Sequence, residues 1–282
     1  MCKNRTSQHA HEMTPHLLHS CLLVCYDVII PRAVSPTLGV RKRNIFDPSS
    51  DDPFKLSRSK LELFLQCPRC FYLDRRCGVG QPSGPPFTLN VAVDALLKRE
   101  FDHHRARGEP HELMKEYGVD AVPYQHPDLE QWRTNFRGMQ VLHKPTNFLF
   151  FGAVDDIWES PTGQLSVVDY KATSTQKEIS LEDEWKKAYK RQMEIYQWLL
   201  RGNGFPVSDI GYFVYVNADS AREHFGKKLE FTTQIISYTG DDSWVEEALQ
   251  EAHNCLCRER VPAPAVHCEW CAYRKAAKSC KE

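Results

Sequence analysis

The chain has 282 residues, of which 41% are hydrophobic and 26% are charged. Those proportions are ordinary for a globular protein and exclude disorder over most of the chain. The 36 basic and 37 acidic residues leave a formal net charge of -1. This balance neither favours nor excludes a nucleic-acid partner, because a carboxylate-rich active site can offset a local basic groove.

The first 50 residues differ from the rest of the chain. They show no hydrophobic period, and they end in a basic run followed by the turn-rich sequence DPSSDDP. We therefore predict a poorly ordered extension over 1–50 and one folded domain over 51–282. A translation start assigned too far upstream is an alternative explanation for the same segment.

Residues 17–30 form the single long apolar run near the start of the chain. The run is too short to span a membrane and contains His19 and Asp27. It also resembles a signal peptide poorly, since no Lys or Arg lies between Thr6 and the run. With 11 cysteines and no export signal, we predict a reducing cytoplasmic compartment, no membrane, and cysteines that are thiols or metal ligands.

From Phe54 onward the hydrophobic pattern predicts helices and strands in alternation. A short helix is expected over 57–65 with Ser57 or Ser59 as N-cap, then helices over 88–107 and 128–139. Strands over 147–158 and 165–172 flank the turn residues 159–164 and form an antiparallel hairpin.

The second half of the chain continues this alternation. A helix is predicted over 181–201, with Ser180 and Asp183 resembling a capping box, and a final helix over 241–260. Strands are predicted over 210–217 and 228–237 between these two helices. The fold class is therefore α/β, a mixed sheet flanked by helices, with an N-terminal arm and a cysteine-containing C-terminal tail.

The hairpin brings acidic and basic side chains together. Asp169 and Lys171 share one face of their strand, and a turn centred near Pro161 places Asp155 beside Asp169. Neighbouring carboxylates repel unless a cation lies between them, and Mg²⁺ prefers oxygen ligands. Asp155, Asp169 and the carbonyl of Tyr170 are candidate ligands of Mg²⁺ or Mn²⁺, with Lys171 beside the water and the phosphate. A surface hairpin with a salt bridge is the alternative.

The helix after the hairpin supplies a third candidate element. Gln192 and Tyr196 are four residues apart and share a helix face. On their own they are equally compatible with a helix face that packs against the core and whose polar atoms form hydrogen bonds with neighbouring residues.

Taken in order, these motifs resemble the RecB-like branch of the PD-(D/E)XK nuclease superfamily. The resemblance rests on Gly152-Ala-Val-Asp155, Val167-Val-Asp169-Tyr-Lys171, Gln192-Met-Glu-Ile-Tyr196 and the segment from Ser57 to Leu73, and it covers roughly 54–282. It is nearest to the CRISPR-associated RecB-like exonucleases. It implies a restriction-endonuclease-like core, metal ligation by Asp155 and Asp169, a catalytic Lys171, and an accessory motif at Gln192 and Tyr196.

One position departs from that family. The family often has a His in its first core helix, before x-x-Leu, where this chain has Asp94. Asp94 is a further candidate cation ligand, and a solvent-facing helix residue is the alternative.

The cysteines suggest a second metal site. Cys67-Pro-Arg-Cys70 lies before the core, and Cys268-Glu-Trp-Cys271 lies after it. The resemblance implies an iron–sulfur (4Fe-4S) cluster on Cys67, Cys268, Cys271 and Cys280. A rival set replaces Cys280 with Cys70 and suits Zn²⁺ or a cluster equally. Buried thiols without a metal are the third alternative.

The resemblance implies a divalent-metal-dependent deoxyribonuclease, an exonuclease that hydrolyses phosphodiester bonds of single-stranded DNA or DNA with free ends. A helicase, a CRISPR protein or a repair protein is the partner class that this implies. A catalytically inactive DNA-binding or assembly subunit and a zinc-binding interaction module are the alternatives. Candidates for phosphate contacts are the basic residues Arg69, Arg75, Arg76, Lys186, Lys187, Lys190 and Arg191.

Overall fold

The computed structural model of the protein describes residues 40–82 and 84–280. The predicted disorder of 1–39, including the apolar run at 17–30, lies outside the described residues. Phe46 is buried, and its ring packs against those of Phe54 and Phe148 at centroid distances of 5.3 and 6.1 Å. Within the described part of the chain, none of the helices combines the length and hydrophobicity needed to cross a bilayer.

The larger of two sheets carries the predicted hairpin. Its strand order is β2 (Val122–Pro123), β5 (Asp156–Glu159), β6 (Leu165–Thr173), β7 (Ile210–Ala218) and β8 (Phe231–Thr239). β5 and β6 are antiparallel, β6 and β7 are parallel, and β7 and β8 are antiparallel. The sheet is therefore mixed, as the sequence predicts.

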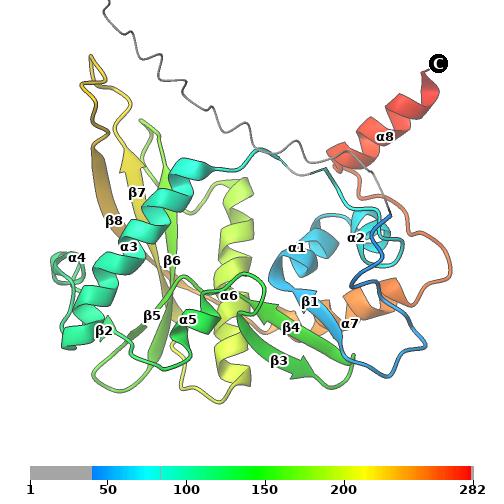
Figure 1. The fold of residues 1–282 in the computed structure, drawn as a ribbon, viewed down its shortest axis with the longest axis horizontal. Coiled ribbons are helices and arrows are strands. Elements are labelled where there is room, and N and C mark those ends of the chain that lie inside the picture. The colour runs from blue at the N-terminus through cyan, green and yellow to red at the C-terminus, as the bar shows by residue number, and fades with distance from the viewer. Residues whose placement is uncertain (1–39, 83, 281–282) are drawn as a thin grey trace, which may run out of the picture. The chain divides into compact units, whose positions relative to one another are not determined.

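Helices cover both faces of this sheet (Figure 1). α3 (Thr88–Arg107) packs on one face, where Phe101 meets Trp158, Val168 and Tyr170. α6 (Lys187–Gly202) packs on the opposite face, where Met193 and Ile195 belong to the same cluster as Val167 and Phe213. The alternation along β6 confirms that Asp169 and Lys171 lie on the other face from Val168 and Tyr170.

The smaller sheet has the strand order β1 (Phe54–Ser57), β4 (Phe148–Gly152) and β3 (Met139–His143). β1 is parallel to β4, and β3 is antiparallel to it. The helices α1 (Arg58–Gln66), α2 (Pro68–Arg75) and α7 (Trp244–Leu256) lie around it, and α6 contacts both sheets (Figure 1). α6 therefore joins the two sheets through one continuous hydrophobic core.

Two sequence-based predictions are wrong. The single strand predicted over 147–158 is two strands, β4 and β5, which belong to different sheets. The helix predicted over 128–139 is only α5 (Leu129–Trp132), and β3 begins at Met139. The helix ends at Trp132, well before Gly138. Gly138 excludes a helix only at the end of the predicted range, because its φ is +59° and an added Cβ would lie 2.3 Å from the carbonyl oxygen of Gly152.

Other boundaries differ by a few residues. The helix predicted from 181 starts with a 3₁₀ turn at Glu184–Lys186, and the Ser180–Asp183 capping box does not form at its N-cap. Ser57 is the N-cap of α1 by position but makes no side-chain capping bond. The helices α2, α4 (Glu112–Glu116) and α8 (Glu269–Ser279) and the strands β1, β2 and β3 were not predicted.

Candidate metal and catalytic centre

Asp155 lies at the point where the chain passes from the small sheet to the large one. β4 ends at Gly152, and Asp156, the first residue of β5, pairs with Val168 of β6. The predicted register is thereby confirmed, and the Tyr170 N–H donates to Asp155 Oδ2 at 3.1 Å. Because the chain leaves the small sheet just before Asp155, the Asp155 carboxylate lies beside the Asp169–Lys171 segment of β6.

Asp169 is the most buried member of the group. Its side chain has no solvent exposure, and Gln192 of α6 donates to its Oδ1 at 2.8 Å. Lys171 forms an ion pair with its Oδ2, and the Lys171 ammonium also lies 4.5 Å from the centre of the Tyr189 ring. Asp155, Asp169, Lys171 and Gln192 therefore converge, from β6, α6 and the link before β5.

The electrostatics of this group favour a bound cation. Burial, and then the Asp155 carboxylate, raise the pKa of Asp169 to about 6 against the opposing effect of Lys171. Among the described residues, the buried Asp169 Oδ2 has the ion pair with Lys171 as its one polar contact. Two carboxylates with an under-coordinated buried oxygen suit a hard divalent cation such as Mg²⁺ or Mn²⁺.

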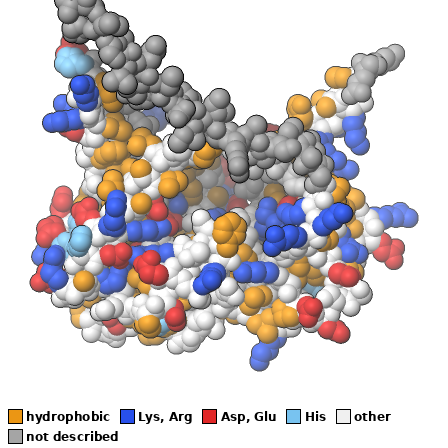
Figure 2. Space-filling view, in the orientation of Figure 1, with side chains coloured by type: hydrophobic (Ala, Val, Ile, Leu, Met, Phe, Trp, Pro, Cys, Tyr) orange, Lys and Arg blue, Asp and Glu red, His pale blue; other side chains and the backbone are white. Residues whose placement is uncertain are grey.

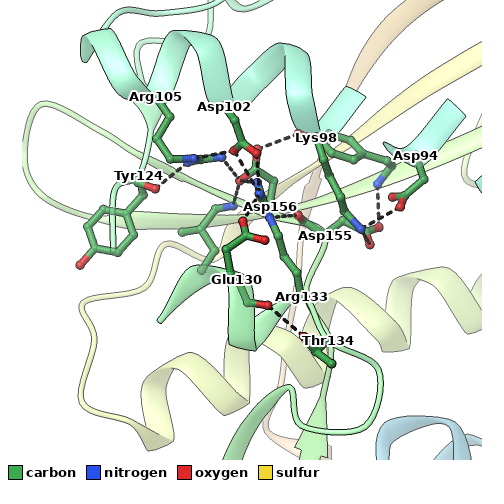
Figure 3. Close-up of polar contacts among 12 residues, drawn as sticks. Asp94, Lys98, Asp102, Arg105, Tyr124, Glu130, Arg133, Thr134, Asp155 and Asp156 are labelled. Carbon is green, nitrogen blue, oxygen red and sulfur yellow. Dashed lines mark hydrogen bonds and ion pairs between the residues drawn. The ribbon is translucent and has the colours of Figure 1, made fainter. Parts of the chain in front are cut away.

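Asp94 is linked to Asp155 by a lysine that sequence reasoning missed. Lys98 lies one turn after Asp94 on α3, and its Nζ is 2.9 Å from Asp94 Oδ2 and 3.2 Å from Asp155 Oδ1. Figure 3 shows Lys98 between the two carboxylates. Burial, and then the Asp155 charge, raise the pKa of Asp94. The i,i+4 spacing was the signal in the sequence that could have identified this pair.

A buried ionic network lies beneath Asp155 (Figure 3) and was also missed. Asp156 Oδ1 accepts from Arg105 Nη2 at 2.5 Å and from Arg133 Nη2 at 3.1 Å, and Tyr170 Oη donates to Asp156 Oδ2 at 2.7 Å. Arg133 Nε also donates to the backbone carbonyl of Asp155 at 3.0 Å. Asp156 therefore positions Asp155 through Arg133.

Replacing Asp156 with Ala should destabilise the protein strongly. The change leaves Arg105 and Arg133 buried without this shared counter-ion, and breaking a buried ion pair typically costs about 3–5 kcal/mol. We expect a clear fall in the midpoint of thermal unfolding measured by circular dichroism. Asp128→Ala is the control, because that side chain is 62% exposed. Equal midpoints for the two variants would contradict the structural role of Asp156.

Gly152 is required by the close approach of α6. An added Cβ would lie 2.6 Å from Tyr196 Cε1 and 3.2 Å from Leu199 Cδ1. Tyr196 is buried, and its hydroxyl accepts from Gln192 Nε2 at 3.2 Å. The glycine that precedes Asp155 thus sets how closely the Gln192–Tyr196 pair approaches the centre.

Gly152→Ala is expected to push Tyr196 and Gln192 away from Asp169. Overpacking of this kind typically costs about 1–3 kcal/mol. Thermal unfolding should report the loss of stability, and metal titration should report a weaker divalent site. Gly84→Ala serves as control, since no atom lies within 4 Å of an added Cβ there. A variant as stable as Gly84→Ala would show that Tyr196 accommodates the methyl group.

The cysteines of both C-x-x-C motifs come together. Cys67, Cys70, Cys268 and Cys271 have sulfur atoms that all lie within 4.8 Å of one another. Cys67 and Cys268 are the N-cap residues of α2 and α8. Burial acts to raise the pKa of Cys67, but backbone N–H groups of Ala265 and Cys70 lower it to about 7. Four converging thiols at helix N-termini suit a thiolate-binding metal.

The structure assembles the rival set rather than the set with Cys280. Cys280 is exposed at the C-terminal end of α8, where its Sγ lies 3.7 Å from the Ala276 carbonyl oxygen. Cys255 is buried with its Sγ 3.7 Å from the Pro68 carbonyl oxygen, whereas Cys257 is exposed.

With this geometry, the chain belongs to the PD-(D/E)XK nuclease superfamily, whose family model matches residues 55–276. Membership indicates a metal-dependent nuclease. Among solved structures, the chain is similar to a crystal structure of the protein SSO0001. The identity is 16% and the TM-score 0.39, over 80% of this chain and 85% of the other. No curated protein matches the chain.

Proposed function

We propose that the protein is a divalent-metal-dependent deoxyribonuclease of the RecB-like branch that hydrolyses phosphodiester bonds as an exonuclease. The observation that carries this proposal is the convergence of Asp155, Asp169 and Lys171, with Gln192 donating to Asp169. Its preferred substrate is DNA that is single-stranded or has free ends. Its partner would be a helicase, a CRISPR protein or a repair protein.

The residues divide the work of hydrolysis between them. Asp155, Asp169 and the Tyr170 carbonyl would hold Mg²⁺ or Mn²⁺, which when bound lowers the pKa of water and stabilises charge on the phosphate. Burial acts to lower the pKa of Lys171, but the Asp169 and Asp155 charges raise it above its usual value. The Lys171 ammonium is therefore charged at neutral pH and suits stabilisation of the negatively charged transition state.

A catalytically inactive DNA-binding or assembly subunit is the second candidate. The observation that favours it is Lys98, because its ammonium already contacts Asp155 Oδ1 and Asp94 Oδ2. In that case the lysine would take the place of the divalent cation. Calorimetric titration with Mn²⁺ separates the two candidates: the nuclease binds the ion at the carboxylates, and the inactive subunit does not.

The cysteine site would hold Zn²⁺ or a 4Fe-4S cluster, since four thiolates accept either. Visible absorption and elemental analysis of protein purified without oxygen would distinguish the two. A reducing, cytoplasmic setting would keep these thiols available to a metal.

Exonuclease action is tested with two substrates of the same sequence. One is a linear single-stranded DNA labelled at either end, and the other is the same strand closed into a circle. We expect Mn²⁺-dependent degradation of the linear strand and persistence of the circle. Equal loss of both substrates would indicate an endonuclease and leave the metal-dependent centre unaffected.

A further inference from the structure

The basic residues near the site differ in whether they already form an ion pair or a hydrogen bond with another residue of the protein. Of the seven candidates for phosphate contacts, six are occupied in ion pairs or hydrogen bonds, with Asp74, the Phe46 carbonyl, Asp183, Glu184, Glu182 and Glu62 as partners. Figure 2 likewise shows Lys and Arg mixed with Asp and Glu over much of the visible face. Arg69 has neither kind of contact within the described residues.

Arg69 lies beside other basic residues that also lack acidic partners. It lines an open cavity of about 410 Å³ together with Arg274, Lys275 and Lys278 of α8, next to Cys268 and Cys271. Across residues 40–82 and 84–280, no ion pair involves any of these four side chains. Four cations that converge without an acidic side-chain partner among the described residues favour an anionic ligand.

Two exposed aromatic rings lie on the same helix as these cations. Trp270 and Tyr273 of α8 are 41% and 71% exposed, and Trp270 lies one helical turn before Arg274. Cations that contact phosphates and aromatic rings that stack on bases are together the features of a single-stranded nucleic-acid surface. A folded duplex would offer its phosphates but keep its bases inside.

We propose that Arg69 and α8 form a second nucleic-acid contact, separate from the catalytic centre, which grips the backbone of a single strand. This rests on the proposed nuclease function and adds a binding surface that the carboxylate centre does not contain. In this proposed surface, Arg69, Arg274, Lys275 and Lys278 contact phosphates, and Trp270 and Tyr273 stack on bases.

The cysteine site controls this surface. α8 has 11 residues and buries none of them, and isolated helices of that length are marginal in water. Cys268 caps α8, Cys271 lies in its first turn, and their sulfurs lie 3.5 and 3.6 Å from that of Cys70. A metal on these thiols would therefore order α8, and its loss should weaken nucleic-acid binding as well as stability.

The test is binding of a fluorescent single-stranded oligonucleotide to the full-length, metal-loaded protein, followed by anisotropy at several salt concentrations without added divalent ion. The variant carries Arg274→Gln, Lys275→Gln and Lys278→Gln. The charge-matched control carries Lys115→Gln, Lys144→Gln and Lys228→Gln, which are exposed elsewhere on the surface. Circular dichroism and metal content verify that both remain folded and loaded.

We expect the α8 variant to bind at least about tenfold more weakly than the control and to lose about two units of salt slope, as three lost phosphate contacts predict. Tyr273→Ala should weaken binding without changing that slope. Affinity within twofold of the control, or no binding by the wild type, would overturn the inference. Binding without cleavage by the wild type would instead contradict the nuclease proposal and leave this surface standing.

Discussion

Lys171→Met is expected to reduce DNA cleavage by at least about 10²-fold while the protein stays folded. Methionine keeps much of the length and packing of lysine but removes the charge that lies against Asp169 and over the Tyr189 ring. Removal of one preorganised group that stabilises transition-state charge typically costs about 10²–10³ in kcat. Initial rates on end-labelled DNA with saturating Mn²⁺ measure the effect.

Lys144→Met is the matched control for that experiment. Lys144 is exposed in the turn between β3 and β4 and forms no ion pair with any described residue. Its cleavage rate should equal that of the wild type. If Lys171→Met retained more than a tenth of the wild-type rate, the lysine on β6 would not be catalytic.

Cys271→Ser is expected to remove the metal of the cysteine site and to destabilise the protein by several kcal/mol. A metal that ties Cys67 and Cys70 to Cys268 and Cys271 joins segments about 200 residues apart in sequence, and structural metal binding contributes directly to folding. At about 2–4 °C per kcal/mol, the unfolding midpoint should fall by roughly 10 °C. Elemental analysis and calorimetry together provide the measurement.

Two further serine variants separate the alternative ligand sets. Cys280→Ser should keep its metal, because Cys280 is exposed at the end of α8 and away from the four converging sulfurs. Cys70→Ser should lose it. The reverse pattern would support the ligand set that the family resemblance implies, with Cys280 in place of Cys70.

The elements with strong periodic patterns were the ones that sequence could predict. α3 spans Thr88–Arg107 as expected, and the antiparallel β5–β6 hairpin has the expected register. The strand break after Gly152 was missed, although Gly152 and the acidic pair Asp155–Asp156 interrupt the apolar run there. Its cause is tertiary: β4 pairs with β1 and β3, whereas β5 pairs with β6 and β2.

Only those residues of the candidate centre that lie close to one another in the sequence could be predicted. Asp155, Asp169 and Lys171 are close in a hairpin, and Gln192 and Tyr196 follow on the next helix. Arg105 and Arg133 lie far from Asp156 in sequence, so no short spacing indicates that they share its carboxylate. The adjacent acidic pair Asp155–Asp156 was the one local sign that a second, structural carboxylate accompanies the first.

The most direct test of the central claim is release of labelled nucleotide from linear single-stranded DNA, measured with Mn²⁺, with a chelator, and with Asp169→Asn. Asp169 is the buried carboxylate that Gln192 and Lys171 both contact. A carboxylate centre that works through a divalent ion predicts cleavage by the wild type with Mn²⁺, and none with the chelator or the variant. Undiminished cleavage by Asp169→Asn, or no cleavage by the wild type with any divalent ion, would contradict it.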